Sequence, residues 1–298
     1  MSCEIVEASP IRLSQSSTLC QTTIEKSLKI EGKGLFSGKQ VEMTLLPAPA
    51  GHGIVFQRID LPERPLLPAR LENVKATPRC TILGNDKAEV QTVEHFLSAM
   101  HALGIDNLLV QISGPEVPIG DGSALPFIQL VRGAKRKTLD EYKKIIEVHS
   151  PVHFSKNDVT LIALPSEEFR ISYTLHFPQS SCIGTQFYSF SLSEEKFVQE
   201  IAPSRTFCLY EEIAPLLEKG VIRGGGLESA VVIKDNRVAN PEGLRFKGDE
   251  NVRHKILDLI GDLCLLGNPI LAHIIAIRSG HATNIEFARC LQKKMENP

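Results

Sequence analysis

Three side chains that can bind a metal ion or transfer protons recur at four-residue spacing late in the chain. His254, Asp258 and Asp262 occupy positions i, i+4 and i+8, so on a helix they form one line along the cylinder. An imidazole and a carboxylate one turn apart can hold one metal ion, with a further carboxylate in support. The same spacing is also common for a solvated or hydrogen-bonded pair. A metal site open to substrate therefore needs a third ligand from elsewhere.

The stretch that carries these residues has the periodicity of an amphipathic helix. Its apolar stripe consists of Val252, Ile256, Leu259, Ile260 and Leu263. This pattern predicts a long helix over about residues 250–266, ended by Gly267, Asn268 and Pro269. An apolar strand is expected over residues 270–277, and a last helix from about Gly280 to residue 294.

A second stretch, residues 92–103, also predicts a helix. Thr92 is a suitable N-cap, Gly104 a suitable stop, and Glu94 and His95 fall in the first turn. A carboxylate beside an imidazole at a helix start is also an ordinary first-turn acid favoured by the helix dipole.

Both stretches continue in the same order, with a glycine, an apolar strand, a second glycine and another helix. The glycines are Gly104 and Gly114 in the first stretch, and Gly267 and Gly280 in the second. We interpret this as two copies of one α+β unit, with chance similarity as the alternative. If the copies pack about a pseudo-twofold axis, His95 lies opposite His254 and supplies the third ligand.

Composition restricts the class of protein. The 298 residues suffice for one large domain or two ordinary ones, and 33 basic against 35 acidic residues give no case for nucleic acid as a partner. The seven cysteines are widely spaced without C-x-x-C, which argues against a disulfide scaffold and fits a reducing compartment. No uncharged apolar run reaches the about 18 residues of a membrane span. We expect a cytoplasmic protein, with a charged interdomain linker over residues 132–144.

An ordered set of short motifs from about residue 21 to the C-terminus resembles one enzyme family. The motifs include Gly34-Leu35, Ser37-Gly38-Lys39, Thr92-Val93-Glu94-His95, Asp121-Gly122-Ser123-Ala124, Arg205-Thr206-Phe207, Glu242-Gly243-Leu244-Arg245-Phe246, Val252-Arg253-His254-Lys255 and Ser279-Gly280-His281-Ala282. Each motif alone is common, but the ordered set is specific. The chain resembles the zinc-dependent UDP-3-O-acyl-N-acetylglucosamine deacetylases of lipid A biosynthesis.

The resemblance implies an α+β fold of two similar domains, each a sheet packed with helices, with the active site between them. We expect the domains over residues 21–134 and 135–298, after a loose N-terminal extension over residues 1–20. An insert near residues 211–232 would build an apolar passage for the acyl chain. Its suitable side chains are Ile213, Leu216, Leu217, Val221 and Ile222.

The resemblance also implies one zinc ion per chain, held by His95, His254 and Asp258. Three protein ligands leave a position for water, whose pKa the metal lowers toward neutrality. Glu94 would be the general base acting on this zinc-bound water, which is the nucleophile. His281 would be the general acid toward the leaving amine.

Four further residues receive roles by the same resemblance. The Thr206 hydroxyl would stabilise the oxyanion together with zinc, and Asp262 would hold a protonated catalytic imidazole and raise its pKa. Lys255 would bind substrate or stabilise charge near the site, and Phe207 would contact the sugar. Without the resemblance, ordinary structural roles explain each of these residues.

The expected reaction is hydrolysis of the N-acetyl group of UDP-3-O-(3-hydroxyacyl)-N-acetylglucosamine, an early committed step of lipid A biosynthesis, by a cytoplasmic monomer. Phe36 stands where the family usually has a histidine, which bears on contacts with the nucleotide. A zinc deacetylase of another acetylated sugar is therefore one alternative. The other is a non-catalytic, two-domain, metal-containing binding protein. A glutamate beside one of only three ligands argues against a closed structural metal site.

Overall fold

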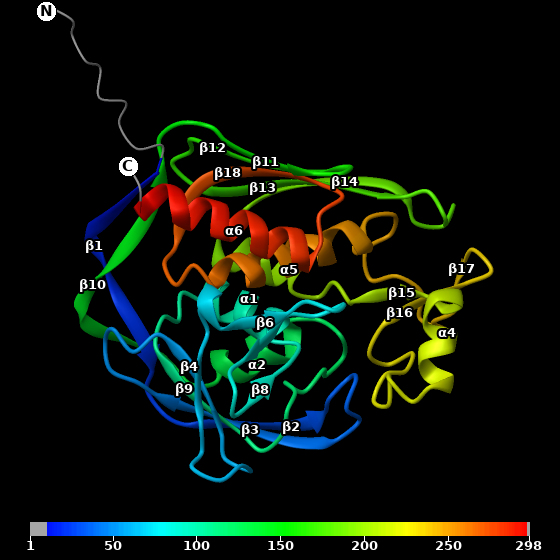
Figure 1. Ribbon diagram of the computed structural model, residues 1–298, viewed down its shortest axis with the longest axis horizontal. Helices are drawn as coiled ribbons and strands as arrows, with labels where there is room; N and C mark the ends of the chain where they lie inside the picture. The colour runs from blue at the N-terminus through cyan, green and yellow to red at the C-terminus, as the bar shows by residue number, and fades with distance from the viewer. Residues whose placement is uncertain (1–10, 297–298) are drawn as a thin grey trace, which may run out of the picture.

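The computed structural model describes residues 11–296, in which two β-sheets enclose a set of helices (Figure 1). The first sheet has five strands around β9 (Leu108–Ile112). Its strand order is β2 (Leu28–Lys33), β3 (Gln40–Pro47), β9, β4 (Ile54–Arg58) and β5 (Leu66–Pro68). Leu108, Val110 and Ile112 of β9 are buried, while the residues between them are partly exposed. This alternation places one face of the sheet against the core.

The second sheet has seven strands around β18 (Ile270–Ile277). Its other strands are β1 (Ile11–Ile24), β10 (Arg136–Val148), β11 (Val152–Lys156), β12 (Val159–Leu164), β13 (Phe169–Phe177) and β14 (Gly184–Ser191). β1 and β10 form a long antiparallel ribbon at one side of the molecule, which connects the levels of the two sheets (Figure 1).

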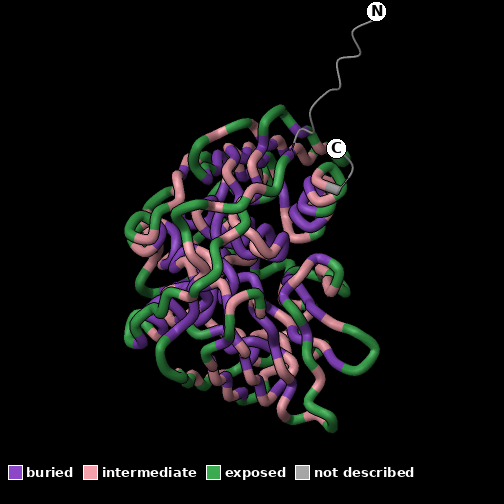
Figure 2. The backbone as a smooth tube through the Cα atoms, turned by 90° about the vertical axis from the view of Figure 1, so that its left-hand side faces the viewer, coloured by how far each residue is buried: buried purple, intermediate pink, exposed green. Residues whose placement is uncertain are grey.

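Four helices lie between the sheets: α1 (Glu94–Ala102), α2 (Leu125–Arg132), α5 (Glu250–Cys264) and α6 (His281–Glu296). The predicted stripe of α5 is buried along its whole length, as are most other residues of this helix. α5 packs against α1, α6 and β13, which explains why so few of its side chains reach solvent. Figure 2 shows the same distribution, with buried stretches inside and exposed loops at the periphery.

The two sheets share one topology, which confirms the predicted internal repeat. The strand order β2-β3-β9-β4-β5 corresponds to β11-β12-β18-β13-β14. In each sheet the central strand is antiparallel to one neighbour and parallel to the other. In the chain this strand lies between two helices, as α1-β9-α2 and as α5-β18-α6. The fold is therefore α+β with two similar halves.

The two halves are in close contact where α5 crosses the start of α1. A Cβ atom on Gly261 would lie 2.1 Å from the carbonyl oxygen of Glu94. Any side chain at this position would separate the helices, so glycine is required here. The close contact brings residues of the two halves to one place.

Shorter elements complete the fold. In the first half they are the 3₁₀ turn η1 (Leu71–Asn73), β6 (Val74–Ala76), β7 (Ile82–Gly84) and β8 (Glu89–Val90). In the second half they are α3 (Glu194–Lys196), the π-helical turn η2 (Phe197–Ile201), β15 (Phe207–Leu209), α4 (Tyr210–Glu218), β16 (Val231–Lys234) and β17 (Arg237–Val238). α4 and β15–β17 project from one side of the molecule (Figure 1). Among the helices of residues 11–296, none is long and apolar enough to cross a bilayer.

Two expectations from the sequence need correction. Residues 11–20 belong to β1 and pair with β10, so they are not a loose extension; residues 1–10 lie outside the described part. The charged stretch 132–144, expected as a linker, contains the end of α2 and most of β10. The sequence did not predict these two strands, because the β1–β10 ribbon is largely exposed on both faces and therefore lacks a hydrophobic period.

Candidate active site

Three potential metal ligands converge where α1 meets α5. The Asp258 Oδ1 atom lies 3.7 Å from Nε2 of His95 and 3.3 Å from Nε2 of His254. One ligand atom from each of the three residues lies within 4.8 Å of the others, and all three residues are buried. His95 comes from the first half and the other two from the second, as the internal repeat predicted.

The donor atoms of this group have the chemistry that a divalent cation requires. Asp258 Oδ1 is buried and has no hydrogen-bond partner among the described residues, whereas Oδ2 accepts a 2.7 Å hydrogen bond from Lys255. Nδ1–H of His254 donates to the Ser204 carbonyl at 3.1 Å, which leaves its Nε2 with a free lone pair. Burial lowers the pKa of His95 to about 3 and also lowers the pKa of His254. Two neutral imidazoles and an unpaired carboxylate oxygen therefore fit a cation.

Glu94 begins α1 beside this group. Its Oε2 accepts a 3.0 Å hydrogen bond from the backbone N–H of Thr81, and its Oε1 lies 3.8 Å from Nε2 of His281. Burial raises the pKa of Glu94 to about 7, although the charge of His281 acts in the opposite direction. A carboxyl group with this pKa can accept and release a proton near neutral pH.

His281 begins α6 and faces Glu94 across the site. Its Nδ1 donates to Oδ2 of Asp262 at 2.9 Å, and its Nε2 lies 3.8 Å from Oδ2 of Asp258. Burial would lower the pKa of His281, but the negative charges of Asp262, Asp258 and Glu94 outweigh burial and raise it to about 9. The imidazole is therefore protonated at neutral pH.

Thr81 connects Glu94 with the Asp262–His281 pair. It was not predicted as a site residue from the sequence. Its backbone N–H binds Glu94, and its hydroxyl donates a 2.6 Å hydrogen bond to Oδ1 of Asp262. Asp262, which is fully buried, also accepts a 2.9 Å hydrogen bond from Asn284. The sequence showed only an apolar run over residues 80–83. The one available signal was a hydroxyl residue inside that run.

A cavity of about 420 Å³ contains this arrangement. Eight of the nine predicted site residues line it, namely Glu94, His95, Thr206, Phe207, His254, Lys255, Asp258 and His281. Asp262 is not among its lining residues and lies behind the His281 ring. Thr206 is fixed through its backbone, which donates to Gly122 at 2.8 Å and accepts from Val231 at 2.7 Å.

A second cavity of about 250 Å³ adjoins the first. The two share lining residues, namely Leu35, Phe36, Arg79, Thr206 and Phe207. The second cavity is otherwise mainly apolar and extends along α4 and β16. Of the five apolar side chains expected there, Ile213, Leu217 and Ile222 line it, whereas Leu216 and Val221 do not.

Comparison with known proteins identifies the family. The family model for UDP-3-O-acyl N-acetylglycosamine deacetylase matches residues 21–293. The chain belongs to this family. It is 46% identical over 277 residues to the UDP-3-O-acyl-N-acetylglucosamine deacetylase of Chlamydia pneumoniae, covering 93% of this chain and 98% of the relative. It is 48% identical to that of Chlamydia caviae, with 90% and 95% covered, and 45% identical to that of Chlamydia trachomatis serovar L2, with 93% and 96% covered. The chain is thus an enzyme, a deacetylase.

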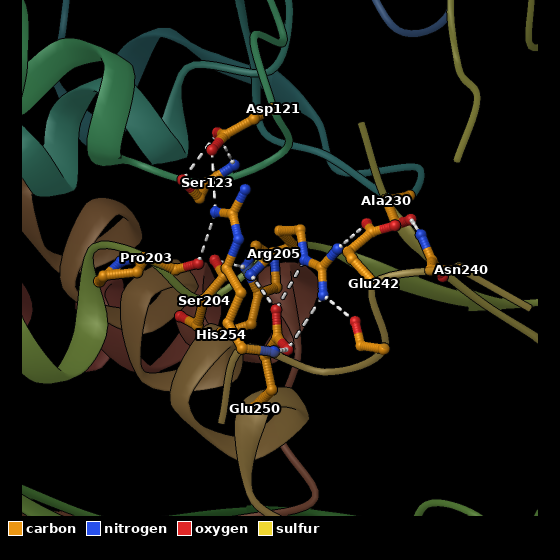
Figure 3. A network of polar contacts seen from close by, with 12 residues as sticks. Asp121, Ser123, Pro203, Ser204, Arg205, Ala230, Asn240, Glu242, Glu250 and His254 are labelled. Atoms are coloured by element: carbon orange, nitrogen blue, oxygen red, sulfur yellow. Dashed lines mark hydrogen bonds and ion pairs between the residues drawn. The ribbon is translucent and has the colours of Figure 1, made fainter. Parts of the chain in front are cut away.

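In this deacetylase a buried ion-pair network fixes the segment that carries Thr206 (Figure 3). Arg205 is 1% exposed; its backbone N–H and its Nε both donate to Oε1 of Glu250, at 3.1 and 2.9 Å. Its Nη1 donates to Glu242 at 2.6 Å. Glu250 is the first residue of α5, one turn before His254. The network therefore sets the position of Ser204 and Thr206 relative to the helix that carries two of the proposed ligands.

Replacing Glu250 by glutamine should lower the free energy of unfolding by about 1–3 kcal/mol, because buried N–H donors lose a charged acceptor. Glu242→Gln is the matched control. Its side chain is 55% exposed, so the loss should stay below about 1 kcal/mol. Urea unfolding of both variants measures the difference. Equal losses would show that Glu250 has no special role in the network.

Proposed function

We propose that this deacetylase hydrolyses the N-acetyl group of UDP-3-O-(3-hydroxyacyl)-N-acetylglucosamine and releases acetate, the early committed step of lipid A biosynthesis. One observation carries the proposal. The His95, His254 and Asp258 group and the Glu94 and His281 pair line a cavity that adjoins a mainly apolar one. Such a pair of cavities suits a substrate with a polar sugar and an acyl chain.

We propose zinc, one ion per chain, as the metal held by His95, His254 and Asp258, because two imidazoles and a carboxylate are a donor set that open zinc sites use. When bound, zinc would supply a Lewis acid that polarises the acetamide carbonyl and lowers the pKa of a water molecule. Lys255 holds the second oxygen of Asp258, so Oδ1 stays directed toward the imidazoles.

Side chains of the site then act as general base and general acid. The Glu94 carboxylate accepts a proton from the water whose oxygen bonds to the acetyl carbon. The Thr206 hydroxyl donates a hydrogen bond to the developing oxyanion. As the carbon–nitrogen bond breaks, Nε2–H of His281 protonates the leaving amine, and acetate departs. Asp262 orients the His281 ring through Nδ1.

Two residues of the cavity act on substrate binding in this proposal. Phe207 contacts the sugar, and its ring already packs edge-on to the His254 ring at a centroid distance of 6.3 Å. Lys255 adds a positive charge to the cavity wall. The walls of the second cavity, formed largely by the insert near residues 211–232, would receive the acyl chain.

The substitution Asp262→Asn tests the proposed acid. His281 must be protonated to act, and the charge of Asp262 is the main influence that raises its pKa. Removal of this charge lowers that pKa, so the basic limb of the kcat profile should move to lower pH. A pH profile of acetate release measures the shift. An unchanged basic limb would assign that limb to another group.

The substrate assignment is tested by acetate release from two compounds. Purified protein should act on UDP-3-O-(3-hydroxyacyl)-N-acetylglucosamine and far less on an acetylated sugar without the acyl chain. Equal or preferred action on the second compound would favour a deacetylase of another acetylated sugar, and Phe36, which lines both cavities, would be the first residue to exchange. We further propose that the enzyme acts as a cytoplasmic monomer.

A further inference from the structure

The loop of residues 34–38, between β2 and β3, is held by a single buried carboxylate. Oε1 of Glu116 accepts a 2.9 Å hydrogen bond from the backbone N–H of Phe36, and Oε2 accepts one of 2.8 Å from Ser37. Glu116 is fully buried, and no basic side chain of residues 11–296 forms an ion pair with it. A buried carboxylate satisfied by backbone donors fixes the position of that backbone.

The same carboxylate reaches the start of the catalytic helix. The Thr92 hydroxyl donates a 3.2 Å hydrogen bond to Oε1 of Glu116. Thr92 has a φ of 58°, a left-handed conformation that is costly for a β-branched residue. It lies two residues before Glu94. Glu116 therefore joins the loop to the backbone that leads into the proposed general base.

The other side of the loop contacts the insert that borders the second cavity. The backbone N–H of Gly224 donates to the Leu35 carbonyl at 3.0 Å. A Cβ on Gly224 would lie 2.0 Å from the carbonyl oxygen of Gly34, and a Cβ on Gly34 would lie 2.3 Å from Oε2 of Glu116. The loop is thus enclosed on both sides, and glycine is needed at both close approaches.

The loop presents its two apolar side chains at the junction of the cavities. Leu35 and Phe36 line both cavities, whereas Glu116 lines neither. Their positions depend on the backbone that Glu116 and Gly224 hold from opposite sides. Movement of this loop would change the entrance to the apolar cavity and leave the metal ligands in place.

We infer that Glu116 is a positioning residue that sets Leu35 and Phe36 at the entrance to the apolar cavity, and so determines how tightly the acyl end of the substrate binds. This inference rests on the proposed substrate. It assigns no contact between Glu116 and the reacting atoms.

The test compares two substrates that differ only in the 3-O-acyl group, one with a long 3-hydroxyacyl chain and one with acetyl. In Glu116→Gln the amide nitrogen cannot accept a hydrogen bond, so one backbone donor of the loop is left unpaired. KM for the long-chain substrate should rise about tenfold or more. The amide oxygen can still accept from Phe36 and Thr92, so KM for the acetyl compound, kcat and the bound zinc should change little. A merely structural role would affect both substrates alike, and that result would overturn the inference.

Gly224→Ala displaces the loop from the opposite side and should produce the same dependence on chain length. If Glu116→Gln does not fold, Gly224→Ala alone tests whether the position of the loop determines binding of the acyl end. Glu42→Gln is the control, because Glu42 lies on β3, is half-exposed and pairs with Lys29. It should behave like the unaltered enzyme.

A binding measurement separates this inference from the proposed function. Displacement of a fluorescent long-chain fatty acid reports on the apolar cavity without catalysis. Weaker binding of this probe by Glu116→Gln than by the unaltered protein supports the inference, even if no acetate is released from either substrate. Equal affinities would overturn it, whatever the activity.

Discussion

Replacement of Glu94 by glutamine should lower kcat for acetate release by about 100- to 10,000-fold, the range typical of a lost general base. The amide is isosteric with the carboxylate and can still accept the hydrogen bond from the Thr81 N–H. It cannot take a proton from the attacking water. Because Glu94 is not one of the three proposed ligands, the variant should bind zinc as the unaltered enzyme does.

The matched control is Glu89→Gln, whose carboxylate forms an ion pair with Lys75 on the surface and lies outside both cavities. It should keep full activity. If the Glu94 variant retains more than a tenth of the activity while zinc is bound, another group must deprotonate the water. If it loses zinc, the residue acts on the metal site and the measured loss says nothing about proton transfer.

Asp258→Asn should abolish stable metal binding and, with it, activity. The substitution replaces a charged oxygen by a neutral amide oxygen between two imidazoles. Even changes in groups that only support metal ligands cost about 10- to 100-fold in affinity, so loss of a ligand charge should cost more. The substitution also removes the carboxylate partner of Lys255, which lies 2.7 Å from Oδ2.

Metal content after dialysis against a chelator measures this effect directly. The unaltered protein should also show a rise in Tm on addition of zinc, because a ligand that binds only the folded state stabilises it. The Asp258 variant should show little or no rise. Asp60→Asn is the control, since Asp60 pairs with Arg58 away from the cavity. Full zinc binding by the Asp258 variant would refute its assignment as a ligand.

The sequence predicted those parts of the fold that have a strong hydrophobic period. The stripe of α5 and the apolar strand β18 pack against α1, α6 and the neighbouring strands. Their apolar residues recur at a regular spacing, so the sequence alone indicates that they are buried. The repeat of helix, glycine, strand and helix predicted that His95 would meet His254, whose rings lie 4.9 Å apart. The β1–β10 ribbon gave no such signal because most of its residues are exposed on both faces.

Groups defined by long-range polar contacts could not be predicted in this way. Thr81 contacts Asp262 across 181 residues of chain, and no local pattern marks that pairing. Thr92 was predicted as an N-cap, but its φ of 58° and its bond to Glu116 place it in another role, and Val93 precedes the helix without a side-chain cap. Glu116 had no predicted role, whereas in the structure its carboxylate accepts hydrogen bonds from Phe36, Ser37 and Thr92.

The most direct test of the central claim is metal-dependent acetate release. Purified protein is assayed on UDP-3-O-(3-hydroxyacyl)-N-acetylglucosamine before chelation, after chelation and after restoration of one zinc ion per chain. We predict that activity is lost with the metal and returns with stoichiometric zinc. Unchanged release by the metal-free protein, with no zinc detected in it, would contradict a mechanism based on His95, His254 and Asp258.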